Sequence, residues 1–367
     1  MHTLKIAVLA AFACGLLPAP LEAQKKQKDV TQTLQLPKDL PNTAVGETRR
    51  LTFYVTPLSA RGLLSAQVRD ALRALLRETG SNPVLRIRAF VAGSGDQRRV
   101  RDLVSETFTD RKLPLPALSL VQAGGLPMEG AQVVIEAVAT ARKDVNPVGI
   151  ALISAQPATS PDPLDPVPPL TEKSLAAMRS AVKAAGSDPA DVIRVTCFFS
   201  TLDNLAASRK LVEAEYGAAA LNFVQTQRAP SQALAACEAV ARIRGEAGAP
   251  LRLLNPEGFA AEPGRSEIAL LGSPHAVFTG TQVSFGFQET DARLAFGRLK
   301  KVIEQAGGGD IAFVHYYPLS ASIAAQVRKV RAEFFDPARP PAGSLLPFES
   351  LPSMDAGFAV DAVAIKE

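Results

Sequence analysis

One five-residue segment recurs three times along this chain, as Ile135-Glu136-Ala137-Val138-Ala139, as Cys237-Glu238-Ala239-Val240-Ala241 and as Val360-Asp361-Ala362-Val363-Ala364. Each copy lies in an apolar run that predicts a β-strand. Internal repeats indicate the architecture of a whole chain more directly than any single predicted helix or strand does. Three matching segments in matching surroundings therefore predict a tandem duplication.

A glycine-containing helix stop also occurs three times. The stops are Thr79-Gly80-Ser81-Asn82-Pro83, Ala185-Gly186-Ser187-Asp188-Pro189 and Ala306-Gly307-Gly308-Gly309-Asp310. Glycine readily takes the left-handed conformation that ends many helices, and proline often follows it closely. Because the stops and the strand segments alternate in the same order, we predict three copies of one unit, each the size of a small domain.

Each copy follows the order strand, helix, glycine stop, strand, helix and two further strands. In the first copy, apolar residues recur at helical spacing at Leu64, Val68, Leu72 and Leu75, and an apolar strand-like run follows the stop. The sequence therefore predicts an α/β (α+β) fold of three units. We expect them over residues 48–142, 143–250 and 251–367.

The N-terminus carries the most apolar segment of the chain. Lys5 precedes an apolar run over residues 6–17 and small residues up to Ala23. Because this run is shorter than the ~20 residues that span a bilayer, residues 1–23 are predicted to be a signal peptide. The expected location is secreted or periplasmic. A lipoprotein attached through Cys14 is the alternative, and no other membrane contact is expected.

Three further segments interrupt the apolar pattern. Residues 24–47 are polar and are predicted to form a flexible leader. Six prolines between Pro157 and Pro169 predict a loop that excludes both helix and central strand. The segment from Asn255 to Arg265 contains two glycines and two prolines, and we expect it to link the last two units.

Composition sets limits on the class of protein. The chain is 47% apolar and 21% charged, which is typical of globular proteins. Without the signal it holds two cysteines, Cys197 and Cys237, which we predict to be small buried hydrophobic residues, with a disulfide as the alternative. His275 and His315 lack neighbouring ligands at metal-binding spacing, so no metal site and no cofactor are expected.

Two segments carry a family resemblance. Gly125-Leu126-Pro127 followed by residues 133–139, and the strand Ala276-Val277-Phe278-Thr279-Gly280-Thr281-Gln282, resemble motifs of the Rid family (YjgF-type, reactive intermediate deaminase, also called endoribonuclease L-PSP). The resemblance covers most of the chain after residue 48. It implies chorismate-mutase-like units, each a mixed sheet with two helices on one face, and clefts for small molecules between neighbouring units. Three copies in one chain imply a monomeric, intramolecular pseudo-trimer.

The resemblance also implies two catalytic residues that this sequence lacks. The family uses an arginine that grips the substrate carboxylate and a glutamate that positions water for attack on an imine. At the arginine's matched positions stand Leu118, Leu221 and Gly343. At the glutamate's matched positions stand Val134, Ala236 and Ala359. Since leucine cannot pair with a carboxylate, the family's deamination chemistry is not expected. The acids nearby, Glu136, Glu238 and Asp361, match a structural position of the family.

Two hypotheses for function follow. The leading one is a catalytically degenerate protein that binds a small molecule in a cleft between units or has a structural role. The alternative is an enamine or imine deaminase with a rebuilt site. Candidate cleft residues for either are Thr279, Thr281, Gln282, Arg339 and Ser344.

A ribonuclease is a third and less favoured hypothesis, suggested by a basic cluster in the first unit. Its members are Arg86, Arg88, Arg98, Arg99, Arg101, Arg111 and Lys112. Such residues can attract phosphates, but a solvated basic face is the preferred interpretation, and no nucleic-acid partner is expected. The aromatic segment His315-Tyr316-Tyr317 is expected in the core or on a sheet surface rather than in a cleft.

Overall fold

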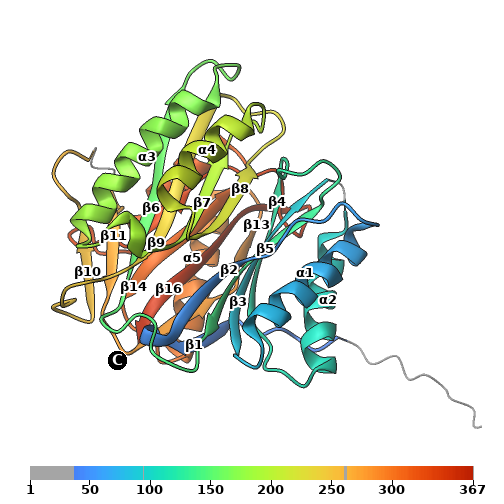
Figure 1. The fold of residues 1–367 in the computed structure, drawn as a ribbon, viewed down its shortest axis with the longest axis horizontal. Coiled ribbons are helices and arrows are strands. Elements are labelled where there is room, and N and C mark those ends of the chain that lie inside the picture. The colour runs from blue at the N-terminus through green and yellow to red at the C-terminus, as the bar shows by residue number, and fades with distance from the viewer. Residues whose placement is uncertain (1–36, 94, 260–262, 367) are drawn as a thin grey trace, which may run out of the picture. The chain divides into compact units, whose positions relative to one another are not determined.

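The computed structural model describes residues 37–93, 95–259 and 263–366, and the expected signal peptide, Cys14 and the first part of the expected leader lie outside them. In the described residues, three mixed β-sheets and six α-helices form one unit that starts at Pro37. Each sheet is covered by two helices (Figure 1).

The first sheet has four strands, in the order β2 (Leu51–Val55), β5 (Val133–Thr140), β3 (Val84–Ala92) and β4 (Ala117–Ala123). Only β3 and β4 are parallel. Helices α1 (Leu64–Thr79) and α2 (Gln97–Asp110) pack on one face of this sheet. The Asp96 carboxylate accepts a hydrogen bond from the Arg98 backbone N–H (2.9 Å), which caps the start of α2.

The second sheet runs in the order β10 (Leu251–Leu254), β11 (Ile268–Leu271), β6 (Ile150–Ser160), β9 (Ala233–Arg242), β7 (Val192–Phe199) and β8 (Ala220–Gln225). Its helices are α3 (Val167–Ala184) and α4 (Leu205–Tyr216). The last four strands of this order repeat the pattern of the first sheet, with β7 and β8 parallel.

The third sheet contains β1 (Thr43–Glu47), β12 (His275–Thr279), β16 (Ala356–Lys366), β14 (Ile311–Pro318) and β15 (Ala342–Leu345) in that order, and β13 (Gln282–Phe285) also pairs with β16. Its helices are α5 (Glu289–Gln305) and α6 (Ala321–Arg331). Here β14 and β15 are the parallel pair, as β3 and β4 are in the first sheet.

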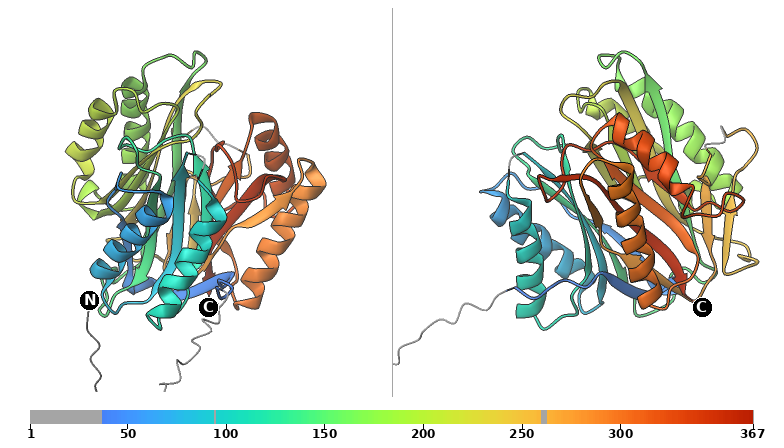
Figure 2. Two further views of the ribbon diagram at one scale, coloured as in Figure 1. Left: turned by 90° about the vertical axis from the view of Figure 1, so that its right-hand side faces the viewer. Right: turned by 180° about the vertical axis from the view of Figure 1, so that it is seen from behind.

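The three helix pairs lie on the outside of the described unit, and the sheets face one another inside it (Figures 1 and 2). Three apolar clusters each join one helix pair to its own sheet. Two further clusters combine residues of all three sheets. The helix-free face of each sheet is therefore covered by the other two sheets, as an apolar sheet face requires.

The predicted helix stops are confirmed. Gly80, Gly186 and Gly307 have φ values of 60°, 74° and 70°, and each follows the end of α1, α3 or α5 within two residues. This left-handed conformation strains residues that carry a Cβ atom, so glycine is favoured at all three places.

Part of the expected leader is folded, so the predicted boundary at Glu47 is wrong. Residues 43–47 form β1, which pairs antiparallel with β12 from Thr43 opposite Thr279 to Glu47 opposite His275. The strand thus precedes the first unit in sequence but belongs to the sheet of the third. No local pattern could indicate this, because the partner lies more than 200 residues away.

The predicted boundary between the second and third units also needs correction. Strands β10 and β11 form an antiparallel pair, and β11 continues onto β6 with Ile268 opposite Ile153. The segment from Asn255 to Arg265 therefore connects two strands of the second sheet instead of linking two units. The third sheet resumes at β12.

The proline-rich segment is not simply a loop. Strand β6 continues through Pro157 to Ser160, and α3 begins at Val167 with Pro168 and Pro169 in its first turn. Prolines in a first turn cost nothing, since those N–H groups have no helical partner. Pro157 is tolerated because β11 pairs with β6 only as far as Ile153, so the missing N–H of Pro157 interrupts no pairing with β11.

The two described cysteines form a disulfide, so the preferred prediction of free buried thiols is wrong. Cys197 on β7 and Cys237 on β9 stand directly opposite each other, with their Cα atoms 4.1 Å apart. Both are fully buried in the apolar cluster under α3 and α4. Only the register of β7 and β9 reveals the pairing, because the residues are 40 positions apart in sequence.

Candidate functional site

The sheets meet along three equivalent seams. Strand β4 of the first sheet lies against β12 of the third, β8 of the second against β2 of the first, and β15 of the third against β6 of the second. The positions matched to the family arginine, Leu118, Leu221 and Gly343, lie on β4, β8 and β15. The seams are therefore where clefts between units were expected.

The seam between the first and third sheets contains a hollow of about 310 Å³, here called the first–third cleft. The Thr281 backbone N–H donates to the Leu118 carbonyl oxygen (3.2 Å) and joins the two walls. Gly280 permits this approach, because a Cβ atom there would lie 2.7 Å from that same oxygen. The lining is mainly apolar, with two arginines from α2, and comprises Leu118, Leu120, Val283, Phe285, Gly280, Thr281, Arg98 and Arg101 among others.

The lining of the first–third cleft favours a particular kind of ligand. Leu118, at the position matched to the family arginine, is half-buried and supplies no hydrogen-bond donor. Arg98 and Arg101 are exposed cations on α2, and Arg101 pairs with Asp39 at 3.5 Å, so the positive charge comes mainly from Arg98. The cleft thus combines an apolar wall with positive charge on one side, which suits a molecule with an apolar body and an anionic group.

A second hollow of about 310 Å³ lies between the second and third sheets and is called the second–third cleft. Arg265 lines it, and its guanidinium donates to Glu267 Oε1 (2.6 Å) and to the Ala155 carbonyl oxygen (3.3 Å). Sequence reasoning did not single out Arg265. It precedes β11, a strand whose position next to β6 was not foreseen.

Gly343 cannot be replaced by an arginine without moving the backbone. A Cβ atom at this position would lie 2.4 Å from the Val314 carbonyl oxygen. The Gly343 backbone N–H donates to the Ser154 side-chain Oγ (2.8 Å), and this hydrogen bond joins β15 to β6 at this part of the seam.

The positions matched to the family glutamate are buried among apolar side chains. Val134, Ala236 and Ala359 are at most 2% exposed, and they pack in one cluster with residues of all three sheets, including Phe90 and Phe198. No carboxylate stands at any of the three positions. These places cannot hold a water molecule for attack in the way that the family resemblance implies.

The predicted cleft residues do not converge on one site. Thr281 lines the first–third cleft. Thr279 is fully buried, and its hydroxyl accepts the Ala362 backbone N–H (2.9 Å). Gln282 is also buried, at the start of β13. Ser344 accepts the Ala155 backbone N–H (3.1 Å) and donates to Glu238 (2.6 Å), so it belongs to the interior.

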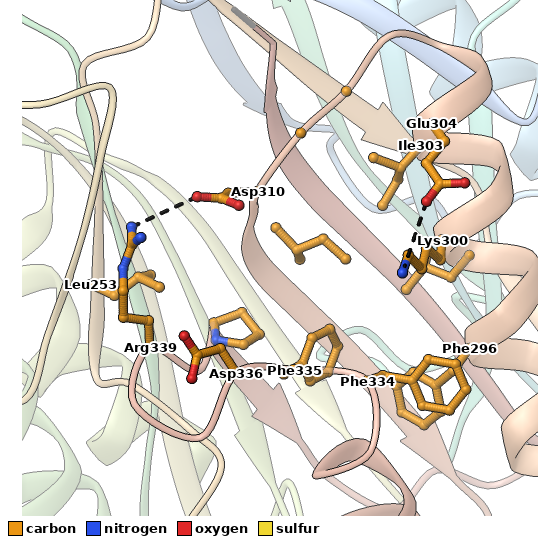
Figure 3. Close-up of a pocket in the computed structure, with 15 residues that line it drawn as sticks. Leu253, Phe296, Lys300, Ile303, Glu304, Asp310, Phe334, Phe335, Asp336 and Arg339 are labelled. Atoms are coloured by element: carbon orange, nitrogen blue, oxygen red, sulfur yellow. Dashed lines mark ion pairs between the residues drawn. The ribbon is translucent and has the colours of Figure 1, made fainter.

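Arg339 lies in a separate hollow of about 360 Å³ beside α5 (Figure 3). Its guanidinium faces Asp310 at 3.7 Å and is more than half exposed. Phe296, Phe334 and Phe335 line the other side of the same hollow (Figure 3). Arg339 therefore shares no cleft with Thr281 or Ser344.

A group of buried ionisable side chains lies where the three sheets meet, and we call it the central charged cluster. Its members are Arg86, Arg88, Glu136, Arg194, Glu238, His315 and Asp361, none more than 8% exposed. Arg86 and Arg88 were expected on a basic surface, which is wrong, since both point inward from β3. His315 was expected in the core or on a sheet surface, and it lies in the core.

The acids of this cluster are linked in a closed cycle. Each accepts a hydrogen bond from a side chain on the neighbouring unit: Glu136 from Asn222 (2.8 Å), Glu238 from Ser344 (2.6 Å) and Asp361 from Ser119 (2.6 Å). The donors stand at equivalent positions of β8, β15 and β4. These hydrogen bonds therefore join the first unit to the second, the second unit to the third, and the third unit back to the first.

Arginines complete the cycle. Arg88 donates to Glu136 (2.7 Å) on its own sheet and to Glu238 (2.6 Å) on the second sheet. Arg86 donates to Asp361 (2.5 Å) on the third sheet. These contacts between units are short and charge-assisted, which makes them the strong members of the network.

The carboxyl groups are held ionised in the folded protein. Burial alone would raise the pKa of Glu136 and Glu238, but the charge of Arg88 and the other cations outweighs it, and both pKa values lie below the ordinary value. For Asp361, burial is likewise outweighed by Arg86 and His315, which lower its pKa. The acids are hydrogen-bond acceptors only, so none is available as a proton donor at neutral pH.

Acid is expected to destabilise the protein through this cluster. A carboxyl whose folded pKa is lowered stabilises the fold above its unfolded pKa of about 4, and this contribution is lost as pH falls toward the folded value. The urea midpoint should therefore fall steadily from about pH 5 downward. Glu238→Gln should reduce this pH dependence, whereas Glu333→Gln, which changes an exposed carboxylate, should change it less. A urea midpoint that is constant between pH 6 and pH 3 would contradict the expectation.

The described residues offer neither a metal-binding group nor a membrane-spanning helix. Residues 37–366, apart from the gaps at 94 and 260–262, contain no group of three His, Cys, Asp or Glu side chains placed to hold a metal ion. In the same part of the chain, no helix has the length and apolarity needed to cross a membrane.

Comparisons with known proteins identify solved structures that are similar to parts of this chain. A Rid-family protein from Yersinia pestis is 20% identical and matches 32% of this chain and 99% of its own, with a TM-score of 0.30. A putative endoribonuclease from Thermotoga maritima is 22% identical over 26% of this chain and 80% of its own, with a TM-score of 0.23. A YjgF-family protein from Neisseria meningitidis is 16% identical over 32% of this chain and 95% of its own, with a TM-score of 0.24. No family model and no curated protein matches the chain.

Proposed function

We propose that this protein is a non-catalytic, Rid-like binding protein that holds a small molecule with an apolar body and an anionic group in the first–third cleft. The observation that carries the proposal is the nature of the six matched catalytic positions. All are leucine, valine, alanine or glycine, and the three at the glutamate positions are buried in an apolar cluster. The first–third cleft is present in this protein, but the arginine and glutamate that imine hydrolysis would need are absent from the matched positions.

We also propose that the three units form an intramolecular counterpart of a trimer. The closed cycle of hydrogen bonds from Asn222, Ser344 and Ser119 supports this arrangement, because each unit supplies one donor and receives one. The units already cover one another, so the protein is expected to be a monomer. A stable homotrimer in light scattering would contradict the proposal.

The protein should not hydrolyse 2-iminobutanoate or 2-iminopropionate above the background rate. The substrate carboxylate and the developing charge both need preorganised donors, and removing one such donor typically costs ~10²–10³ in rate. Leu118→Arg alone should not create activity, since Val134 on β5 of the same sheet still lacks a carboxylate. The measurement is coupled detection of ammonia release, with an active Rid deaminase as positive control. Turnover by the unmodified protein would overturn the proposal.

Ligand binding in the first–third cleft can be tested with 8-anilinonaphthalene-1-sulfonate, which combines an aromatic body with a sulfonate. Its fluorescence should rise on binding to the folded protein, and Thr281→Trp, which fills the cleft, should weaken binding by tenfold or more. Ser231→Trp, in the second–third cleft, is the matched control and should leave binding unchanged. Equal binding by both variants would exclude the first–third cleft as the site.

A rebuilt deaminase is the second candidate function, and one observation favours it. Arg265 places a guanidinium in the second–third cleft, where a substrate carboxylate could be held. Its bond to Glu267 argues against this role, because the guanidinium is already paired. Imine turnover that disappears in Arg265→Met would promote this candidate over the non-catalytic one.

A further inference from the structure

An open hollow of about 710 Å³ lies beside α1, and none of the described residues that line it also lines the first–third or the second–third cleft. Four arginines are among its lining residues. Arg61 comes from the loop before α1, Arg73 and Arg77 from α1 itself, and Arg111 from the position directly after α2. We call this place the arginine hollow.

The positive charge of the arginine hollow is only partly compensated. Asp70 is the only acid among the described residues that line it, and it pairs with Arg73. Arg61, Arg77 and Arg111 make no side-chain hydrogen bond or ion pair with any described residue. Arg73 and Arg77 are one helical turn apart, so their like charges repel each other. With four arginines and one aspartate, the lining carries three uncompensated positive charges.

This charge gathers through the packing of helices and not through a local run of basic residues. Of the basic cluster that the sequence indicated, Arg99 pairs with Glu106 (2.6 Å) and Arg101 with Asp39 (3.5 Å). Arg111 alone of that cluster lines the arginine hollow, and α1 and the loop before it supply the other three arginines. Helices α1 and α2 lie side by side, which brings the four together (Figure 1).

A buried amide holds the walls of the arginine hollow in place. Gln67 is 1% exposed, and its Nε2 donates to the carbonyl oxygens of Gly62 (3.1 Å) and Gly130 (3.0 Å). These bonds tie the loop that carries Arg61 to the turn that carries Met128, and both residues line the hollow. A site that is formed before binding loses less conformational entropy when a ligand arrives.

The arginines favour one kind of anion. A guanidinium presents a planar fork of N–H donors that matches the oxygens of phosphate and of carboxylate. A phosphate ester carries about −1.5 to −2 charges near pH 7 and has three acceptor oxygens, so one group can contact several arginines at once. A carboxylate group brings a single charge to the same donors. Three uncompensated positive charges are therefore matched better by phosphate than by carboxylate.

We propose that the arginine hollow binds a multiply charged phosphate group, held by Arg61, Arg77 and Arg111. The group belongs either to a soluble phosphorylated molecule or to a phospholipid headgroup, since both present the same oxygens to the arginines. The volume of the hollow exceeds that of a single phosphate and leaves room for the adjoining part of the ligand. This site is independent of any ligand in the first–third cleft.

Isothermal titration calorimetry with inorganic pyrophosphate tests the proposal. The double variant Arg77→Gln/Arg111→Gln should weaken binding about tenfold or more, because it removes two charge-assisted contacts. Arg69→Gln/Lys112→Gln is the matched control. It also removes two exposed positive charges, one from α1 and one after α2, but neither residue lines the hollow. The control should bind like the unmodified protein, and equal weakening in both double variants would overturn the proposal.

Two further probes identify the ligand class in the unmodified protein. Sedimentation is measured with phosphatidylcholine vesicles that contain phosphatidic acid and with vesicles of phosphatidylcholine alone. Pyrophosphate binding without sedimentation identifies a soluble phosphorylated ligand. Sedimentation that requires phosphatidic acid and is lost in Arg77→Gln/Arg111→Gln identifies a lipid headgroup. Failure to bind either phosphate probe, or tighter binding of citrate than of pyrophosphate, would overturn the proposal.

Discussion

Arg88→Met should lower the free energy of unfolding by about 3–5 kcal/mol, the usual effect of removing one partner from a buried charge pair. Arg88 is 3% exposed and donates to both Glu136 and Glu238. Its guanidinium also lies 5.1 Å from the ring centre of Phe90. Methionine keeps the apolar contact but leaves two buried carboxylates short of a partner. Since proteins are stable by only 5–15 kcal/mol, much of the fold's stability should be lost.

Urea unfolding followed by circular dichroism would measure this effect. Arg179→Met is the matched control, because Arg179 pairs with Glu215 at the surface and is about half exposed, so its loss should have little effect. Adding Glu238→Gln to Arg88→Met should recover part of the stability, since one uncompensated charge is then removed. The interpretation of the cluster is wrong if Arg88→Met is as stable as the control.

The repeat itself could be predicted from the sequence, because its signals are local. A glycine that ends a helix has the same backbone requirement in each copy, and the three stops are found at α1, α3 and α5. The helices were also predicted from the spacing of their apolar residues. Local geometry and apolar periodicity therefore suffice to identify three copies of one unit.

The assembly of the units could not be predicted in the same way. Strand β1 joins a sheet whose other strands begin more than 200 residues later, and β10 and β11 extend the sheet that precedes them. The central charged cluster was missed for the same reason. Arg86 and Arg88 look like surface residues on a single strand, and only the positions of Glu238 and Asp361 on other sheets explain their burial. The sequence did contain one signal of the cluster, because each of the three repeated strand segments carries one acid among apolar residues.

The central charged cluster offers a physical reason for the order of the units. A buried ion network is seldom more stabilising than apolar packing of the same volume, so stability alone does not explain it. Each acid instead requires a donor from one particular neighbour, as Glu136 requires Asn222. A wrong pairing of sheets would leave buried charges without partners. The cluster is therefore better suited to specifying which sheets meet than to strengthening their contact.

The disulfide braces the same two strands from their other face. Thr196 and Glu238 point toward the central charged cluster, while the adjacent Cys197 and Cys237 point toward α3 and α4. The double variant Cys197→Ala/Cys237→Ala should lower the free energy of unfolding by about 4 kcal/mol, the chain-entropy value for a loop of 40 residues. Reductant present during unfolding should destabilise the unmodified protein to a similar extent and leave the variant unaffected, which provides the control.

The state of these cysteines also bears on where the protein acts. Disulfides persist in oxidising compartments, so we propose that the protein is exported, as the signal-like segment over residues 1–23 predicts. Alkylation of unreduced protein taken from the periplasm, followed by peptide mapping, should recover Cys197 and Cys237 in one linked pair of peptides. The mature chain should also lack residues 1–23. If the two thiols are alkylated in protein that was never reduced, the crosslink is absent and the expected loss of 4 kcal/mol in the double variant should vanish with it.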